Sequence, residues 1–195
     1  MTIDVASYLR DDAEALRQIG AQQDVVLRLV DALDAGAGAG RWAFVVGNGG
    51  SSSTASHAVA DLVKGTAVPG RPALRALCLS DSTPLLTAWG NDRAYSAVFA
   101  EQVRAYGRPG DVLVAISCSG NSPNVLQAVR AAHEVGVTTF GLCGWSGGDL
   151  RGLVEHPLVI DVPLIQQIED AHLAVMHLVS VLLHQRFEAS GLGAK

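Results

Sequence analysis

Cysteine is scarce in this chain of 195 residues, which contains three of them: Cys78, Cys118 and Cys143. They lie far apart in the sequence, no two have a CxxC spacing, and their number is odd. The sequence therefore supports neither a disulfide framework nor a zinc site built from cysteines.

Excess positive charge and long apolar runs are also lacking. The formal net charge is −5 and the sequence pI is about 5.6, so nucleic acid is not an expected partner, and an anionic substrate must be held by local donors. No apolar run reaches the roughly 20 residues of a membrane-spanning helix. The first residues lack the basic and apolar regions of a signal peptide. We expect a cytoplasmic protein with no membrane partner.

Charged residues are few as well, at 17%, whereas hydrophobic residues make up 49%. This balance favours a compact globular protein over a disordered one. The length lies within the usual range for one domain and allows a sizeable buried core. Because no internal repeat is evident, we predict a single domain over residues 1–195, with an N-terminal helical segment at 1–36 and a core at 40–187.

Apolar residues recur at helical spacing among charged residues between positions 4 and 36. They predict one or two amphipathic helices, with Gly20 as the residue at which the segment would break. Such helices need a surface to cover, either the core of their own chain or a neighbouring subunit. The alternating alanines and glycines of residues 35–40 predict a flexible turn after them.

After residue 40, short apolar runs alternate with segments of helical pattern. Strands are expected near residues 44–46, 73–79, 111–116, 137–142 and 158–162. Helices are expected beyond residue 50 and near 95–106, 124–134 and 164–187, with an interruption at 89–92 and a loop at 144–148. The alternation predicts an α/β protein, a three-layer sandwich in which helices cover both faces of a mostly parallel five-stranded sheet.

A corner rich in glycine and serine, residues 47–53, joins the first strand to its helix. Glycines permit positive φ and close backbone approach, and a helix N-terminus presents unpaired N–H groups with partial positive charge. With serine hydroxyls as extra donors, such a corner suits a phosphate. The same composition also occurs in loops that bind no anion.

His57 and Asp61 follow this corner, four residues apart and therefore on one face of the predicted helix. An imidazole and a carboxylate beside a phosphate site indicate proton transfer on a phosphorylated substrate. The alternative is an ordinary pair of surface residues.

A second corner of the same kind, residues 117–122, follows the strand at 111–116. Ser122 is placed to cap the next helix and Pro123 fits its first turn. One such loop alone is usually only a helix cap. Since parallel sheets carry ligand sites at the carboxyl ends of their strands, two corners at equivalent ends favour a phosphate site.

The order of these motifs resembles that of sugar isomerase (SIS) domains, and within them the phosphoheptose (sedoheptulose 7-phosphate) isomerases. The resemblance covers about residues 40–187 and implies the flavodoxin-like SIS fold. The matching segments are Gly47-Asn48-Gly49-Gly50-Ser51, the helix with His57 and Asp61, Gly90-Asn91-Asp92, Gly110-Asp111-Val112-Leu113, Ser117-Cys118-Ser119-Gly120-Asn121-Ser122, and Glu169-Asp170-x-His172-x4-His177.

The resemblance implies an aldose–ketose isomerase that acts through an enediol, with Asp61 as general base and His177 as its acid partner. It also implies a homotetramer with sites at subunit interfaces and the N-terminal helices in its core. By resemblance, zinc binds through His57, Asp61, Glu169 and His177. The substrate-binding residues that it implies are Asn48, Gly49, Gly50, Ser51, Asp92, Ser117, Cys118, Ser119, Ser122 and Glu169.

The residues themselves agree with a metal site in type and number, because two histidines and two carboxylates suit Zn²⁺. Glu169 and His177 lie about two helical turns apart and are rotated by roughly 80°, so both could lean toward one site. A solvated face of the last helix is the alternative for Glu169.

The chain departs from the family pattern at several positions. Asp61 is one methylene shorter than the family's glutamate, which reduces the reach of a base there. The other departures are Glu169 for a glutamine, Gln166 for an aspartate, Gln167 and Gly65 for arginines, and Cys118 for a threonine. At a loop that leads into a helix N-terminus, the Cys118 thiol is a candidate for a lowered pKa. These changes leave the sugar phosphate open.

Other functions remain open at this point: an isomerase of another phosphosugar, a ligand-sensing module, or a non-catalytic scaffold like the relative that binds the bacterial replication initiator. The presence of both Asp61 and His177 favours an enzyme. His133, His156 and His184 have no partner nearby in the sequence and are predicted to be surface, packing or loop residues.

Overall fold

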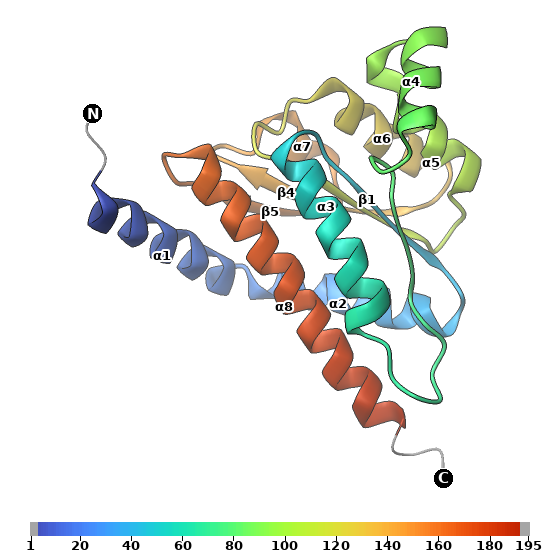
Figure 1. The fold of residues 1–195 in the computed structure, drawn as a ribbon, viewed down its shortest axis with the longest axis horizontal. Helices are drawn as coiled ribbons and strands as arrows, with labels where there is room; N and C mark the ends of the chain where they lie inside the picture. The colour runs from blue at the N-terminus through green and yellow to red at the C-terminus, as the bar shows by residue number, and fades with distance from the viewer. Residues whose placement is uncertain (1–3, 192–195) are drawn as a thin grey trace.

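The computed structural model of the protein describes residues 4–191. Its five strands form one sheet in the order β2-β1-β3-β4-β5, and every neighbouring pair is parallel (Figure 1). The strands are β1 (Trp42–Val46), β2 (Arg75–Cys78), β3 (Val112–Ser117), β4 (Thr138–Gly144) and β5 (His156–Ile160). The predicted sheet is thus confirmed, and the strand order changes direction between β1 and β3, where doubly wound folds bind ligands.

Helices cover both faces of this sheet, which gives the predicted three layers (Figure 1). One face carries α1 (Val5–Ala21), α2 (Gln23–Gly38), α3 (Gly50–Ala60) and α8 (Ile165–Gly191). The other carries α5 (Ala100–Tyr106), α6 (Pro123–Glu134) and α7 (Gly148–Leu153). Alternate residues of β3 enter the two cores, Val112 and Val114 on the α8 side and Leu113 on the α6 side. A strand buried on both faces is therefore an unbroken apolar run in the sequence.

The N-terminal helices pack on the α8 face and also complete the edge of the sheet at β5. Gln22 donates its side-chain amide to the Val159 carbonyl at 2.8 Å and accepts from the Val159 N–H at 3.0 Å. One turn earlier, Gln18 makes the same pair of bonds with Asp161, at 3.0 and 2.8 Å. Two glutamine side chains thus take the place of a further strand and protect an open sheet edge.

Several predicted boundaries were wrong. The break between the first two helices falls at Gln22 instead of Gly20, and α2 continues to Gly38 through the segment predicted as a turn. Its small residues Gly36 and Ala37 are buried there, so packing overrides the low helix propensity of glycine.

The middle of the chain also differs from its prediction. Helix α4 (Thr83–Asp92) runs through the segment 89–92 that was expected to interrupt it. The predicted helix at 95–106 is divided into a 3₁₀ turn, η2 (Tyr95–Ala97), and α5. A short helix, α7, begins where only a loop was expected.

Candidate functional site

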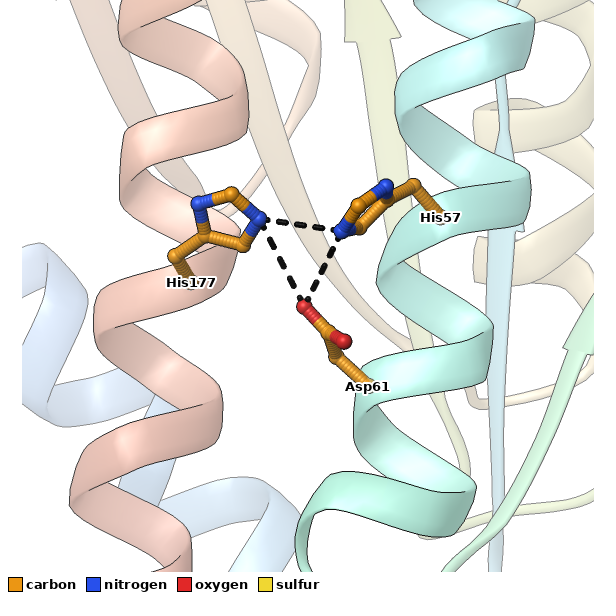
Figure 2. A group of neighbouring side chains, drawn as sticks. All are labelled: His57, Asp61 and His177. Atoms are coloured by element: carbon orange, nitrogen blue, oxygen red, sulfur yellow. Dashed lines mark hydrogen bonds and ion pairs between the residues drawn. The ribbon is translucent and has the colours of Figure 1, made fainter.

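Three side chains from two neighbouring helices meet on the α8 face of the protein. His57 lies on α3, Asp61 begins η1 (Asp61–Gly65), a π-helical turn after α3, and His177 lies on α8. Nε2 of His57 is 3.4 Å and Nε2 of His177 is 3.6 Å from Oδ2 of Asp61, and the two nitrogens are 3.0 Å apart (Figure 2). We call these residues the His–Asp–His group.

The sequence explains why these helices approach closely enough for the group to form. Helices α3 and α8 lie side by side (Figure 1), and α3 is rich in small residues, of which Ala55 and Ala58 are fully buried. His57 and Asp61 are four residues apart, so both project from one face toward α8. The side chains of His57, Asp61 and His177 remain 52%, 33% and 47% exposed, so the group is open to solvent in a single chain.

The group fits a zinc ion in donor type and spacing. Tetrahedral zinc with ligands at about 2.0–2.1 Å requires donor atoms separated by about 3.3 Å. The three separations here, 3.0, 3.4 and 3.6 Å, bracket that value. One carboxylate and two imidazoles would hold a metal by three protein ligands, as catalytic zinc sites do.

The two glycine- and serine-rich corners form a small pocket beside these helices. Strands β1 and β3 are neighbours, so the loops that follow them converge at the carboxyl edge of the sheet. The pocket has a volume of about 130 Å³. It is lined by Asn48, Ser51, Ile116, Ser117, Cys118, Ser119, Ser122, Ile165 and Glu169. Gly49, with a φ of +54°, caps α3 and Gly50 begins it, so the N-terminus of that helix adjoins the pocket.

Asn48 is held in this pocket by two residues that the sequence interpretation missed. It exchanges two amide hydrogen bonds with Asn124, at 2.9 and 2.8 Å, and its Oδ1 also accepts from the Tyr95 hydroxyl at 3.1 Å. Asn124 directly follows the Ser122-Pro123 helix start, which was a usable signal. No such signal marks Tyr95, because its contact with Asn48 joins distant parts of the chain and leaves no local sequence pattern.

Comparison with known proteins identifies this arrangement. A family model described as SIS domain matches residues 7–144. A probable phosphoheptose isomerase of Thermoplasma acidophilum is 35% identical over 185 residues, 95% of this chain and 100% of that protein. The phosphoheptose isomerase of Geotalea daltonii is 36% identical over 191 residues, 95% of this chain and 97% of that protein. The chain belongs to the phosphoheptose isomerase family of SIS domain proteins.

A solved structure extends the agreement to the fold. The phosphoheptose isomerase of Neisseria gonorrhoeae is 31% identical, covers 93% of this chain and 97% of its own, and has a TM-score of 0.81. The family and fold inferred from the motifs are therefore confirmed. Within residues 4–191, no helix combines the length and the apolar character needed to cross a membrane.

Glu169, expected from the phosphoheptose isomerase pattern as a fourth metal ligand, does not join the His–Asp–His group of its own chain. Its carboxylate lies against the first residue of α3: a Cβ built on Gly50 would be 2.2 Å from Glu169 Oε1. The eight residues from Glu169 to His177 rise by about 12 Å along α8, and a rotation of the side chain cannot remove that separation. In this chain Glu169 belongs to the pocket.

The charge and protonation of the pocket follow from burial. Burial raises the pKa of Glu169, and the neighbouring Asp170 raises it further. Burial also raises the pKa of Cys118, although a hydrogen bond with Ser51 opposes the effect. The sequence-based suggestion of a lowered thiol pKa is thus wrong, because removal from water is the largest influence on this thiol.

Replacing Glu169 by glutamine should strengthen binding of sulfate to the pocket by about 10-fold at neutral pH, because a like charge is removed from the site. Since the pKa of Glu169 is raised, sulfate affinity of the unmodified protein should increase as the pH falls through that pKa. Glu169→Gln should lose this dependence. Titration calorimetry measures both effects, with Glu188→Gln, the same change on an exposed residue near the other end of α8, as control. Equal affinities and equal pH profiles would place Glu169 outside the anion site.

Asp92, the remaining predicted substrate residue, does not line the pocket. It ends α4, which projects away from the sheet (Figure 1), and its exposed carboxylate accepts a hydrogen bond from Asn91 at 2.9 Å. In the family pattern this residue follows Gly-Asn, as it does here, but a single chain leaves it apart from the serine loops.

His172 is a packing residue on the buried side of α8. Its Nε2–H donates to the Cys143 carbonyl at 3.1 Å, and burial lowers its pKa to about 4. The three histidines predicted to lie outside the site do so: His133 contacts Thr139, His156 packs on Phe140, and His184 pairs with Glu188.

Buried His172 should make the protein sensitive to acid. The unfolded chain binds the imidazole proton near pH 6.5, and the folded chain only near pH 4, so this stability is present above pH 6.5 and is lost as the pH falls to about 4. The loss is up to about 3 kcal/mol. His172→Gln should lack it, so urea unfolding should show the two proteins converging in stability between pH 7 and 4. A constant difference would contradict this.

Proposed function

We propose that this protein interconverts sedoheptulose 7-phosphate and a heptose 7-phosphate by aldose–ketose isomerisation through an enediol, with the whole chain acting as one SIS domain. The observation that carries the proposal is the meeting of His57, Asp61 and His177 on the helix pair that also borders the serine-lined pocket. The names of the family relatives support it.

The distance between pocket and His–Asp–His group suits a long sugar phosphate. The pocket adjoins Gly50 at the start of α3, and His57 lies seven residues further, about 10 Å along the helix. A phosphate held by Ser51, Ser117 and neighbouring hydroxyls would leave the extended carbon chain of a heptose to reach the group. A three-carbon sugar phosphate would be too short to place its phosphate in the pocket and its carbonyl carbon at the His–Asp–His group.

Within this proposal, Asp61 removes a proton from C1 of the ketose, while His177 supplies a proton to the C2 carbonyl oxygen. The C1–H bond breaks, the C1–C2 double bond of the enediol forms, and the carbonyl becomes a hydroxyl. On the partly exposed carboxyl of Asp61 the removed proton exchanges with solvent. Asp61 then delivers a proton to C2 as His177 takes the proton from the C1 hydroxyl. The second oxygen of Asp61, which points away from the imidazoles in Figure 2, is free for this transfer.

We propose that Zn²⁺ is held by His57, Asp61 and His177. The donor spacing described above supports this, and so does the contact between two imidazole nitrogens at 3.0 Å, which a shared cation would satisfy. Zinc would supply Lewis acidity toward the sugar oxygens at the carbonyl end. Glu169 stays in the proposal as a substrate contact in the pocket.

We also propose that the protein is a homotetramer with its sites at subunit interfaces. The helices around the site expose large apolar side chains: Leu16, Leu27, Val63, Leu178 and Val181 are 52%, 42%, 39%, 42% and 54% exposed. A cavity of about 510 Å³ opens between α1, α2 and α8 on the same side. Large apolar side chains exposed around such a cavity are typical of an interface, and a second copy would enclose the half-exposed His–Asp–His group.

A cytoplasmic location completes the proposal. All three cysteines are free and buried, which suits a compartment where thiols stay reduced.

Incubation of the zinc-loaded protein with sedoheptulose 7-phosphate, followed by proton NMR, tests the proposed reaction. An aldose phosphate should form until equilibrium is reached. Turnover of a different ketose phosphate alone would favour another phosphosugar isomerase. Binding of phosphosugars without any turnover would favour a sensing or scaffold protein.

A further inference from the structure

The segment that carries Asp61 departs from regular helix geometry. Helix α3 ends at Ala60, and η1 continues it as a wider π-helical turn. Two carbonyls of this turn accept hydrogen bonds from side-chain hydroxyls: Leu62 from Thr66 at 2.6 Å, and Asp61 from Ser180 at 3.3 Å. Wide turns of this kind occur frequently at functional sites, and here one begins at the residue assigned as the base.

Ser180 reaches this turn from the neighbouring helix. A serine inside a helix commonly bonds a carbonyl of the preceding turn of its own helix. Ser180, which is 7% exposed on α8, instead bonds the backbone of η1. Gly65 leaves space for this hydroxyl: a Cβ at that position would lie 3.1 Å from Ser180 Oγ, tighter than an ordinary contact, and 3.8 Å from the Cβ of Asp61.

Ser180 and His177 therefore hold the same residue from the same face of α8. They are three residues apart, which places them on neighbouring positions of one helix surface. Ser180 bonds the backbone carbonyl of Asp61, whereas His177 faces its carboxylate at 3.6 Å. An aspartate has little reach, so the position of its backbone decides whether its carboxylate meets both imidazoles.

We propose that Ser180 is a positioning residue, whose hydroxyl fixes the wide turn against α8 so that the short Asp61 side chain completes the His–Asp–His group. Gly65 is the second part of this device, because its missing side chain leaves room for the hydroxyl. The catalytic consequence rests on the proposed isomerase function, whereas the consequence for metal binding does not.

Titration with Co²⁺, followed by its visible absorption, tests the proposal without turnover. Ser180→Ala should weaken Co²⁺ binding by about 10- to 100-fold, the usual effect of losing a residue that orients a metal ligand. Ser190→Ala is the matched control, since it makes the same change on α8 about three turns further, and it should bind Co²⁺ normally. In turnover of sedoheptulose 7-phosphate, Ser180→Ala should lower kcat and leave KM nearly unchanged.

Gly65→Ala supplies independent evidence, because it keeps the Ser180 hydroxyl but obstructs its place. It should weaken Co²⁺ binding as well. The double variant should lose little more Co²⁺ affinity than either single variant, since both substitutions act on the same hydrogen bond from Ser180 to the Asp61 carbonyl. Gly65→Ala also carries the test if Ser180→Ala does not fold. Normal Co²⁺ affinity in both single variants, or losses that multiply in the double variant, would overturn the proposal. If the native protein does not turn over sedoheptulose 7-phosphate but the variants lose Co²⁺ affinity as described, the isomerase function is refuted. The positioning role of Ser180 in metal binding then stands.

Discussion

Asp61→Asn is expected to lower kcat for isomerisation of sedoheptulose 7-phosphate by about 100- to 10,000-fold, the range found when a general base is removed. An amide keeps the size of the side chain but accepts no proton from carbon at neutral pH. KM should change little, because the pocket that would hold the phosphate lies at the other end of α3. The measurement is initial-rate kinetics at saturating zinc.

The control for this variant is Asp24→Asn, which makes the same change on an exposed residue in the first turn of α2. It should leave kcat unaltered. Activity of Asp61→Asn within a few-fold of the native protein would remove the carboxylate from the mechanism, and the His–Asp–His group would then be at most a structural feature.

Gly120→Ala should have the largest effect on stability among substitutions in the pocket loops. Gly120 has a φ of +65°, and a Cβ there would lie 1.9 Å from the carbonyl oxygen of Gly147, a backbone atom that cannot rotate away. The two loops are also tied by a bond from the Leu150 N–H to the Gly120 carbonyl at 2.9 Å. An alanine must push them apart, at a cost of about 2–4 kcal/mol in the free energy of unfolding.

The same displacement would move the hydroxyls of Ser119 and Ser122, so KM for the sugar phosphate should rise as well. Urea unfolding and steady-state kinetics measure the two effects. Gly152→Ala on α7 is the control: among the described residues, no atom outside its own helical turn lies within 4 Å of where a Cβ would stand, and the change should be neutral or stabilising by up to about 1 kcal/mol. If Gly120→Ala proved as stable as Gly152→Ala, the close packing of the two loops would be refuted.

The sheet could be predicted because its inner strands are buried on both faces. Strand β3 is such a run, and its flanking Pro-Gly turn and serine corner fix its position within one residue. Helix α4 could not be bounded in the same way. None of its residues is fully buried and only Leu86 and Trp89 pack partly against the core, so its apolar pattern is weak. The poor helix formers Gly90 and Asn91 therefore led to a predicted end that was too early.

The site was predictable where chemistry follows from local spacing and not where it depends on packing between elements. The pairing of His57 with Asp61 follows from a four-residue interval. The position of Glu169 depends on how α8 is shifted along α3. A sequence pattern predicts which face of a helix carries a residue, but not how far one helix is shifted along another. The π-helical turn at Asp61, with its bond from Ser180, likewise depends on a contact 119 residues away in sequence.

The central claim is that a carboxylate on one helix and an imidazole on the next move a proton between neighbouring carbons of a heptose phosphate. Isomerisation in D₂O, followed by NMR, tests it most directly. The native protein should incorporate deuterium at C2 of the aldose and, by the reverse reaction, at C1 of the ketose, while Asp61→Asn and His177→Gln should do so at least about 100-fold more slowly. Product without deuterium, or unchanged exchange in both variants, would contradict the claim.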